Sequence, residues 1–188
     1  MLAGMAADPS TAVTTTARVD ARVVASLEDV AGVQLQRFGS NNGDRLVHLG
    51  AFPAYTGVRI GVHYLASAQG GGLVLGGLVA ASTTGVSRPL EAERTTYASF
   101  GPRVGWAFGM GRTLGAWVRV GPTLLLLKEG TQGGSKQWLD LSLEAQLAWT
   151  FTPRVALLFG PSASLGLFAK RNERHQAFGF LLGLGVML

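Results

Sequence analysis

Residues 140–149 read DLSLEAQLAW, and apolar side chains alternate with polar ones along most of this stretch. Successive side chains of a β-strand point to opposite faces, so the alternation predicts a strand with one apolar face and one polar face. The face that meets water then decides the class of protein. A polar exterior indicates a soluble sandwich or barrel, whereas a polar interior indicates a barrel whose apolar face meets lipid.

The composition is too apolar for the exterior of an ordinary soluble domain. Only 14% of the 188 residues are charged, 27 are glycine, and the mean hydropathy is +0.28. Soluble domains average about 25% charged residues. The absence of cysteine excludes disulfides, thiolate nucleophiles and thiolate metal ligands. The net charge is +5, but the basic residues are scattered singly, which argues against nucleic-acid binding.

Alternation and turn residues divide the chain into a regular series of strands. An eighth strand lies within 17–38, where two short stretches alternate. The other seven are predicted over residues 56–66, 72–83, 96–108, 113–127, 136–151, 154–168 and 176–188. Segments of about ten or more residues suit tilted membrane strands better than the five or six residues usual in soluble sheets. We expect one barrel domain over 17–188, preceded over 1–16 by a signal remnant or a disordered N-terminus.

A membrane-spanning helix is the alternative for the apolar runs. The longest stretch without Asp, Glu, Lys or Arg covers 60–87, but SAQGGG lies in its middle. These six residues break a helix and make a good turn between two strands. The remaining apolar runs are shorter than the roughly 18 to 20 residues that a spanning helix needs.

The connections between the predicted strands alternate in length. Short turns and longer, charged connections alternate along the chain, the short ones at 67–71, 109–112 and 152–154 and the longer ones at 84–95, 128–135 and 169–175. Outer-membrane barrels have this pattern, with short periplasmic turns and longer extracellular loops. Both chain termini are accordingly expected on the periplasmic side.

The parity of the strands indicates which face meets lipid. Over 178–188 the large apolar residues share one parity, while glycine dominates the other, and Val118 and Val120 likewise flank Arg119. The bulky face is apolar throughout, and small inward residues suit the narrow interior of an eight-stranded barrel. Aromatic residues near the short turns share the outward parity, as an interfacial girdle requires: Tyr64, Trp106, Phe108, Trp149 and Phe151. The sequence therefore predicts an all-β, antiparallel, up-and-down transmembrane β-barrel of eight strands.

Three stretches resemble the predicted outer-membrane β-barrel proteins of myxobacteria, which belong to the small OmpA/OmpX-like class of eight-stranded barrels. They are GPRVGWAFGMGRTLGAWVRVGPTLLL (101–126), LSLEAQLAWTFTPRVALLFGPSASL (141–165) and FGFLLGLGVML (178–188). The resemblance covers residues 46–188 and rests on strand texture and turn sequences, without a catalytic motif. It implies the barrel fold and no particular activity. Such barrels usually end in Phe or Trp, whereas this sequence ends in Leu188, which weakens the last position of the insertion signal.

Polar side chains on the inward parity are the candidates for chemistry. We expect a satisfied structural network, because buried charges need partners, and the alternative is a catalytic or transport group built from the same residues. The set is Arg59, His63, Arg103, Trp117, Arg119, Asp140, Glu144 and Gln146. No metal or cofactor is expected, since the histidines show no metal spacing and no phosphate-binding loop or nucleophile motif occurs.

The hairpin around residue 132 predicts one specific ion pair. A turn at that point places Arg119 opposite position 145 and beside Glu144 or Gln146. We expect Arg119 to pair with Glu144, and Arg103 to sit beside Trp117 within reach of the same carboxylate. Glu144 would then bind two guanidinium groups.

Two classes of function follow from this interpretation. The favoured one is a structural or surface-interaction barrel whose loops contact lipopolysaccharide, an envelope partner or another cell, with Lys170, Arg171 and Arg174 as surface contacts. The alternative is an outer-membrane enzyme of the lipid A acyl hydrolase or transferase type. A diffusive porin ranks third, because eight strands leave no open aqueous channel.

The predicted location is the outer membrane of a Gram-negative bacterium, with the protein as a monomer. Its expected partners are outer-membrane lipids, with lipopolysaccharide as one candidate, and the barrel-insertion machinery during biogenesis.

Overall fold

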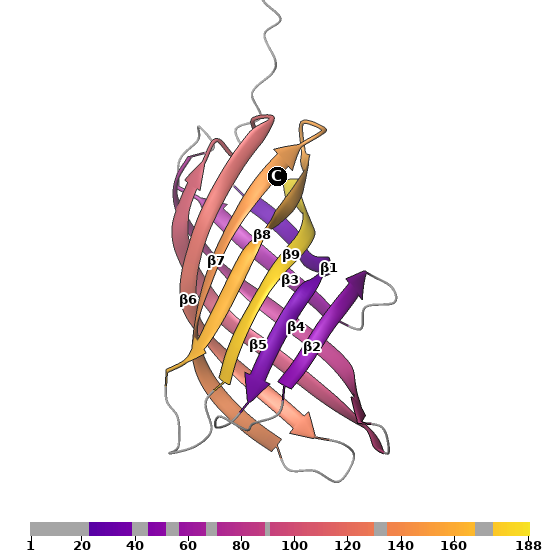
Figure 1. The fold of residues 1–188 in the computed structure, drawn as a ribbon. Coiled ribbons are helices and arrows are strands. Elements are labelled where there is room, and N and C mark those ends of the chain that lie inside the picture. The colour runs from indigo at the N-terminus through magenta and orange to yellow at the C-terminus, as the bar shows by residue number, and fades with distance from the viewer. Residues whose placement is uncertain are drawn as a thin grey trace, which may run out of the picture.

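The fold is an antiparallel β-barrel (Figure 1). The computed structural model describes residues 23–38, 45–51, 57–66, 71–88, 91–129, 135–167 and 175–188. Its strands are β1 (Val23–Phe38), β2 (Arg45–Ala51), β3 (Gly57–Leu65), β4 (Gly72–Arg88), β5 (Glu91–Phe108), β6 (Leu114–Glu129), β7 (Ser135–Thr150), β8 (Val155–Gly166) and β9 (His175–Met187). Among these described residues, no helix is long and apolar enough to cross a membrane.

The sheet closes on itself with eight strand positions around the barrel. Each strand from β3 to β9 pairs with the next along the chain, and β9 returns to pair with β1. On its other edge β1 has two partners, because residues 23–28 pair with β3 and residues 31–37 pair with β2. β2 and β3 therefore share one position in the wall. This topology confirms the predicted class, an eight-stranded antiparallel barrel.

Parts of two predicted loops are strand instead. β2 falls between the first two predicted strands, and the connection predicted at 84–95 consists mostly of the paired ends of β4 and β5. There Thr84 pairs with Thr95, and Arg88 with Glu91. Threonine and valine fit a pleated strand well, so the hairpin continues past the predicted limits. Residues 1–16, where a signal remnant or disorder was expected, lie outside the described residues.

The stretch DLSLEAQLAW lies in β7 with its polar face inward. The side chains of Asp140, Ser142, Glu144 and Gln146 are buried, whereas the leucines that alternate with them are exposed. Leu143 is 50% exposed and its neighbour Glu144 only 1%. The polar ribbon therefore lines the lumen, and the apolar ribbon forms part of the outer surface.

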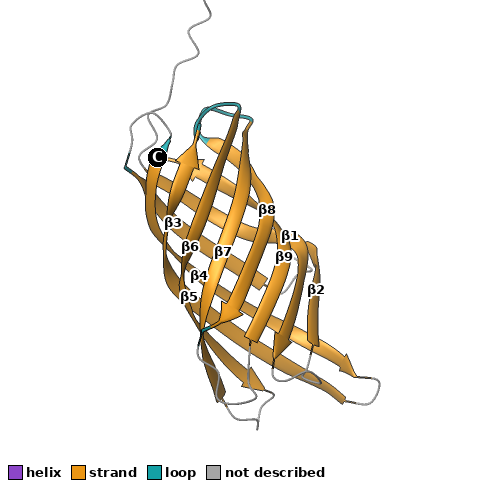
Figure 2. Ribbon diagram, turned by 60° about the vertical axis from the view of Figure 1, so that its left-hand side comes forward, coloured by secondary structure: helices purple, strands orange, loops and turns teal. Residues whose placement is uncertain are grey.

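Large apolar side chains are exposed on the outer surface of the barrel in the strands β3 to β9. They include Ile60, Val79, Val104, Val118, Leu143, Leu165 and Phe178. The short connections 109–113 and 151–154 lie at one end, which we call the turn end and which is uppermost in Figure 2. Exposed aromatic residues gather toward that end: Tyr64, Trp106, Phe108, Trp149 and Phe151. Such a surface suits hydrocarbon with an interfacial girdle, and it would be costly in water.

Buried apolar side chains fill the lumen at the turn end. We call this group the turn-end cluster; it comprises Val24, Leu65, Val74, Ala107, Met110, Trp117, Ala148, Ala156, Leu158 and Met187. Met110 reaches it from the turn between β5 and β6, which is tight because Gly109 and Gly111 have φ of +62° and +86°. Side chains other than glycine rarely adopt such angles. The turn-end cluster is thus a packed apolar layer inside one end of the barrel.

Gly105 is a position where the narrow barrel leaves no room for a side chain. An added Cβ would lie well inside contact distance of the Val118 carbonyl oxygen on β6. We expect Gly105→Ala to lower the free energy of unfolding by about 1 to 3 kcal/mol, the usual cost of overpacking. Gly77→Ala is the matched control, because its Cβ would meet only the Gly101 oxygen at 3.6 Å. Urea titration of the refolded barrel measures the free energy of unfolding of both variants. Equal effects would show that the backbone of β6 shifts to accommodate the added methyl group at position 105.

Candidate functional site: a charged layer and a cavity in the lumen

Five charged side chains lie next to the turn-end cluster, near the middle of the lumen. We call them the charged layer: Glu28 of β1, Arg59 of β3, Arg103 of β5, Arg119 of β6 and Glu144 of β7. Each sits on the inward parity of its strand, so the barrel brings together side chains that are far apart in sequence. Burial of such charges is tolerated because each has opposite charges within reach.

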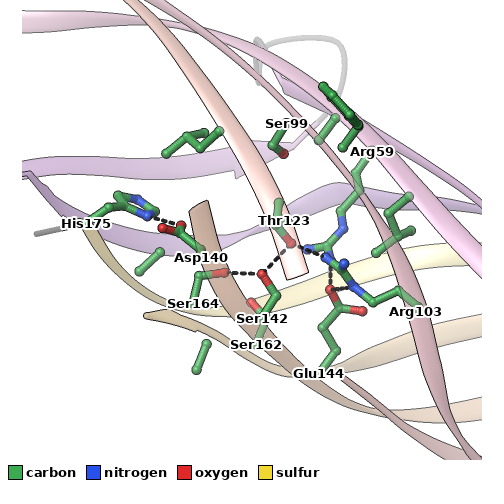
Figure 3. A pocket seen from close by; sticks show the side chains of 16 residues that line it. Arg59, Ser99, Arg103, Thr123, Asp140, Ser142, Glu144, Ser162, Ser164 and His175 are labelled. Atoms are coloured by element: carbon green, nitrogen blue, oxygen red, sulfur yellow. Dashed lines mark hydrogen bonds and ion pairs between the residues drawn. The ribbon is translucent and has the colours of Figure 1, made fainter. Parts of the chain in front are cut away.

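Glu144 binds three arginines. Its Oε1 accepts from Arg103 Nε at 3.1 Å and also contacts Arg59 Nη2 (Figure 3). Arg119 Nη2 lies 2.8 Å from Oε2. The strand register pairs Arg119 directly with Glu144, one residue away from position 145, which the hairpin count placed opposite Arg119. The sequence indicated two guanidinium groups, and Arg59 is the third.

Glu28 is the second carboxylate of the layer, and it was not predicted. Arg119 donates from Nη1 to Oε1 and from Nη2 to Oε2, each at 2.9 Å, and Ser26 Oγ donates to Oε1 at 2.8 Å. Arg59 Nε lies 3.6 Å from Oε2. The pairing of β1 with β9 shifts register between Leu27 and Ala31, directly beside this residue. A count of alternating inward and outward residues cannot be carried through this bulge. Before the bulge, however, the alternation is regular and places Val24, Ser26 and Glu28 on the inward face.

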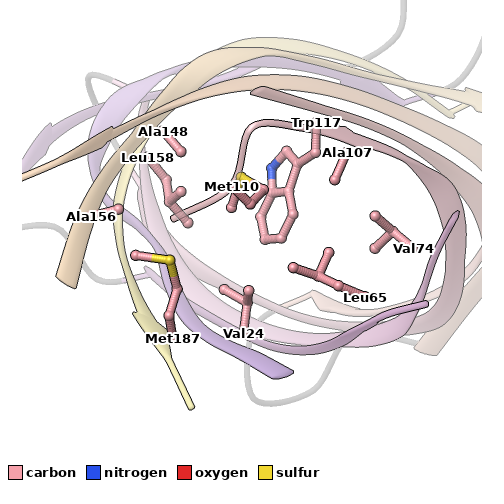
Figure 4. Close-up of a cluster of buried hydrophobic side chains, with 10 residues drawn as sticks. All are labelled: Val24, Leu65, Val74, Ala107, Met110, Trp117, Ala148, Ala156, Leu158 and Met187. Carbon is pink, nitrogen blue, oxygen red and sulfur yellow. The ribbon is translucent and has the colours of Figure 1, made fainter. Parts of the chain in front are cut away.

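Trp117, Gln146 and His63 surround Arg119 on the side of the turn-end cluster. The guanidinium lies 4.1 Å from the centre of the Trp117 ring, and Trp117 Nε1 donates to Gln146 Oε1 at 2.7 Å (Figure 4 shows Trp117 within the cluster). Arg119 Nη1 is 2.6 Å from His63 Nε2, which must accept because a guanidinium has no acceptor. The His63 and Trp117 rings pack edge to face, with their centres 4.9 Å apart. Arg119 is therefore fully buried, with partners at both of its Nη atoms.

The predicted position of Arg103 beside Trp117 is wrong by four residue pairs. Trp117 pairs with Ala107, and continuing the register from Val104 and Val120 puts Arg103 opposite Gly121. Arg103 nevertheless reaches Glu144, because its long side chain crosses the narrow lumen.

Arg103 also donates hydrogen bonds where the pairing between β5 and β6 is interrupted. The pairing of β5 with β6 stops at Phe100 and Leu124 and resumes at Val104 and Val120, so that Pro102 faces Pro122 in the gap. Proline has no N–H to donate to the ladder. Arg103 Nη1 donates instead to the carbonyl oxygens of Pro102, at 2.9 Å, and Pro122, at 3.3 Å.

Arg103→Lys is expected to lower the free energy of unfolding by about 1 to 3 kcal/mol although the charge is kept. A lysine ammonium cannot hold Glu144, Thr123 and two proline carbonyls at once, and unsatisfied buried acceptors cost about this much. Arg112→Lys, at an exposed turn position, is the control. A loss no larger than that of the control in urea titration would mean that the carbonyls are satisfied without the guanidinium fork.

A second polar group lies on the other side of the charged layer, toward the end opposite the turns. His175 Nδ1 contacts Asp140 Oδ2, and a chain of hydroxyls runs from Arg103 through Thr123 and Ser142 to Ser164, at 2.9, 2.8 and 2.6 Å (Figure 3). His175 was predicted to lie in a loop. It is the buried first residue of β9 instead, and its ring lies 6.3 Å from that of Trp138.

A cavity opens beside these hydroxyls. It is partly open to solvent, and residues of every strand from β3 to β9 line it (Figure 3). Arg59, Arg103 and Glu144 border it on the side of the charged layer, and Asp140 and His175 also line it.

The lumen thus brings together all eight predicted polar residues in two groups. Seven belong to or touch the charged layer, and Asp140 stands apart with His175. Among the described residues, no three His, Asp or Glu side chains are grouped so that they could hold a metal ion. The predicted surface contacts Lys170, Arg171 and Arg174 lie outside the described residues.

Comparison with known proteins finds the same architecture in solved structures. No family model matches the sequence, and no curated protein matches it. Neisserial surface protein A (NspA) has a TM-score of 0.64 at 11% identity, over 88% of this chain and 97% of that one. Ail, the attachment invasion locus protein of Yersinia pestis, has a TM-score of 0.56 at 13% identity, over 90% and 99%.

The N-terminal β-barrel domain of Pseudomonas aeruginosa OprF has a TM-score of 0.51 at 13% identity, over 87% of this chain and 98% of that one. Identities this low establish the fold and nothing finer. The chain therefore has the eight-stranded antiparallel barrel fold of small outer-membrane proteins.

Proposed function

We propose that the protein is a small outer-membrane β-barrel of a Gram-negative bacterium, with a plugged lumen and a structural or surface-interaction role. The observation that carries the proposal is the inside-out distribution of side chains: Trp149 is 52% exposed, whereas Trp117 is 0% exposed. Side chains pack across the lumen at two levels, the turn-end cluster and the charged layer. This packing supports a barrel that conducts no solute. Function then belongs to the segments at the end opposite the turns.

The proposed orientation puts the turn end and both termini in the periplasm. Short turns face the periplasm in outer-membrane barrels, and longer loops face outward. Lys170, Arg171 and Arg174 would then be available to lipopolysaccharide, an envelope protein or another cell. Outer-membrane lipids and the insertion machinery are the further proposed partners, the protein acts as a monomer, and its source among myxobacteria rests on the sequence resemblance alone.

The lipid-modifying enzyme is the less favoured function. A catalytic histidine acting on lipid must reach the outer surface near the membrane plane. His63 and His175 are both buried in the lumen, with 0% and 3% of their surface exposed, and face other strands. Lipidomic comparison of cells with and without the protein tests this choice. We expect an unchanged acylation pattern, and a changed one would favour the enzyme.

Cysteine labelling in intact cells tests the orientation, since the natural sequence has no cysteine. Arg171→Cys should react with a membrane-impermeant maleimide in intact cells. Arg112→Cys, at a turn between β5 and β6, should react only after the outer membrane is permeabilised. The reverse pattern, or labelling of both in intact cells, would contradict the proposed orientation.

A further inference from the structure

The cavity is a space that side chains leave open in an otherwise filled barrel. The interior of an eight-stranded barrel is just wide enough for side chains to fill, and the charged layer and turn-end cluster fill it with Trp117, Arg119 and His63. Beyond them several inward positions carry small side chains. Ala80, Ser99, Ser142, Ser162, Ser164 and Ala177 line the cavity from five different strands. If the side chains at this level served only to close the lumen, larger residues would be expected here.

The walls of the cavity differ in polarity. Hydroxyls of Ser142, Ser162 and Ser164 line it on β7 and β8, while Leu78 and Ala80 line it on β4. Asp140 is 1% exposed, and its Oδ1 has no hydrogen-bond partner among the described residues. A buried carboxylate oxygen without a donor is costly, so it is a ready acceptor for a ligand hydroxyl.

The charges of the lumen exclude a strong preference for an ionic ligand. Arg59, Arg103 and Arg119 are balanced by three carboxylates, those of Glu28, Asp140 and Glu144. The guanidinium groups are already engaged with these carboxylates, with hydroxyls and with backbone carbonyls. An anion entering the cavity would have to break such pairs. A neutral ligand rich in hydroxyl groups would not.

We propose that the cavity binds a neutral saccharide unit, with its hydroxyls on the serine side and Asp140 and its less polar face against β4. Entry of the ligand from the cell exterior depends on the proposed membrane orientation, whereas binding of the ligand in the cavity does not depend on it.

Saturation-transfer NMR on the refolded full chain in detergent micelles tests the proposal. The probes are glucose, galactose and N-acetylglucosamine, with gluconate and glucosamine as charged comparators. We expect at least one neutral sugar to receive saturation from the protein and to bind at least tenfold more tightly than either charged comparator. No transfer to any neutral sugar, or tighter binding of a charged one, would overturn the proposal.

Two adjacent alanines of β4 provide a matched pair of variants. Ala80 lines the cavity, whereas Ala81 is exposed on the outer surface. Ala80→Leu should weaken sugar binding at least tenfold, and Ala81→Leu should leave it unchanged, with heat-modifiable gel mobility showing that both variants fold. Equal binding by the two variants would place the sugar elsewhere and overturn the assignment. Since micelles remove sidedness, a failure here leaves the membrane orientation untouched, and a reversed orientation leaves the sugar result untouched.

Discussion

Glu144→Ala is expected to lower the free energy of unfolding of the refolded barrel by about 3 to 5 kcal/mol, the usual cost of stranding a buried ionic partner. The variant would leave Arg59, Arg103 and Arg119 facing one remaining carboxylate of the layer, Glu28. Like charges would then be buried together without compensation. Urea titration in detergent, followed by tryptophan fluorescence, measures the loss.

Lys128→Ala is the control for Glu144→Ala, because Lys128 is exposed near the end of β6. Its effect should lie near zero, as for most surface charges. Equal small effects of the two substitutions would mean that Glu144 is solvated, and that the polar ribbon of β7 does not line a closed interior.

Arg119→Met is expected to cost a similar amount, about 3 to 5 kcal/mol. Arg119 is fully buried and makes both hydrogen bonds of a bidentate pair with Glu28 as well as an ion pair with Glu144. Methionine keeps an unbranched apolar side chain at this position, so the loss reports mainly on the guanidinium group.

A double-mutant cycle separates the pair energy from general damage. When Glu28→Gln is added to Arg119→Met, the carboxylate no longer needs a cation, and the double variant should be less destabilised than the sum of the single variants. Contacting residues commonly show coupling of about 0.5 to 3 kcal/mol. Strictly additive losses would show that Arg119 and Glu28 do not act as a pair.

The fold could be predicted because the side-chain pattern of a membrane barrel is regular and local. Alternation in β7 and β9, together with a low proportion of charges, was enough to assign the outward face. The register of Arg119 with Glu144 could be predicted to within one residue from one hairpin, since a single turn fixes all the pairs after it.

The missed features depend on irregularities that alternation does not report. Glu28 stands beside a bulge, and β2 fills part of a strand position whose other part is β3. His175 enters the lumen only because β9 starts one residue before its predicted limit. The facing prolines, Pro102 and Pro122, could be seen as a pair only once the register of β5 with β6 was known.

Quenching of single tryptophans by brominated lipids tests most directly the central claim that the apolar face meets lipid. Of the four tryptophans, Trp106 and Trp149 are exposed on the outer surface, at 51% and 52%, and Trp117 and Trp138 are buried in the lumen, at 0% and 4%. Four variants, each keeping one tryptophan and carrying phenylalanine at the other three positions, are refolded into bilayers of lipid brominated near the headgroup. The structure predicts strong quenching of Trp106 and Trp149 and protection of Trp117 and Trp138. Protection of the first pair, or equal quenching of all four, would contradict the inside-out barrel.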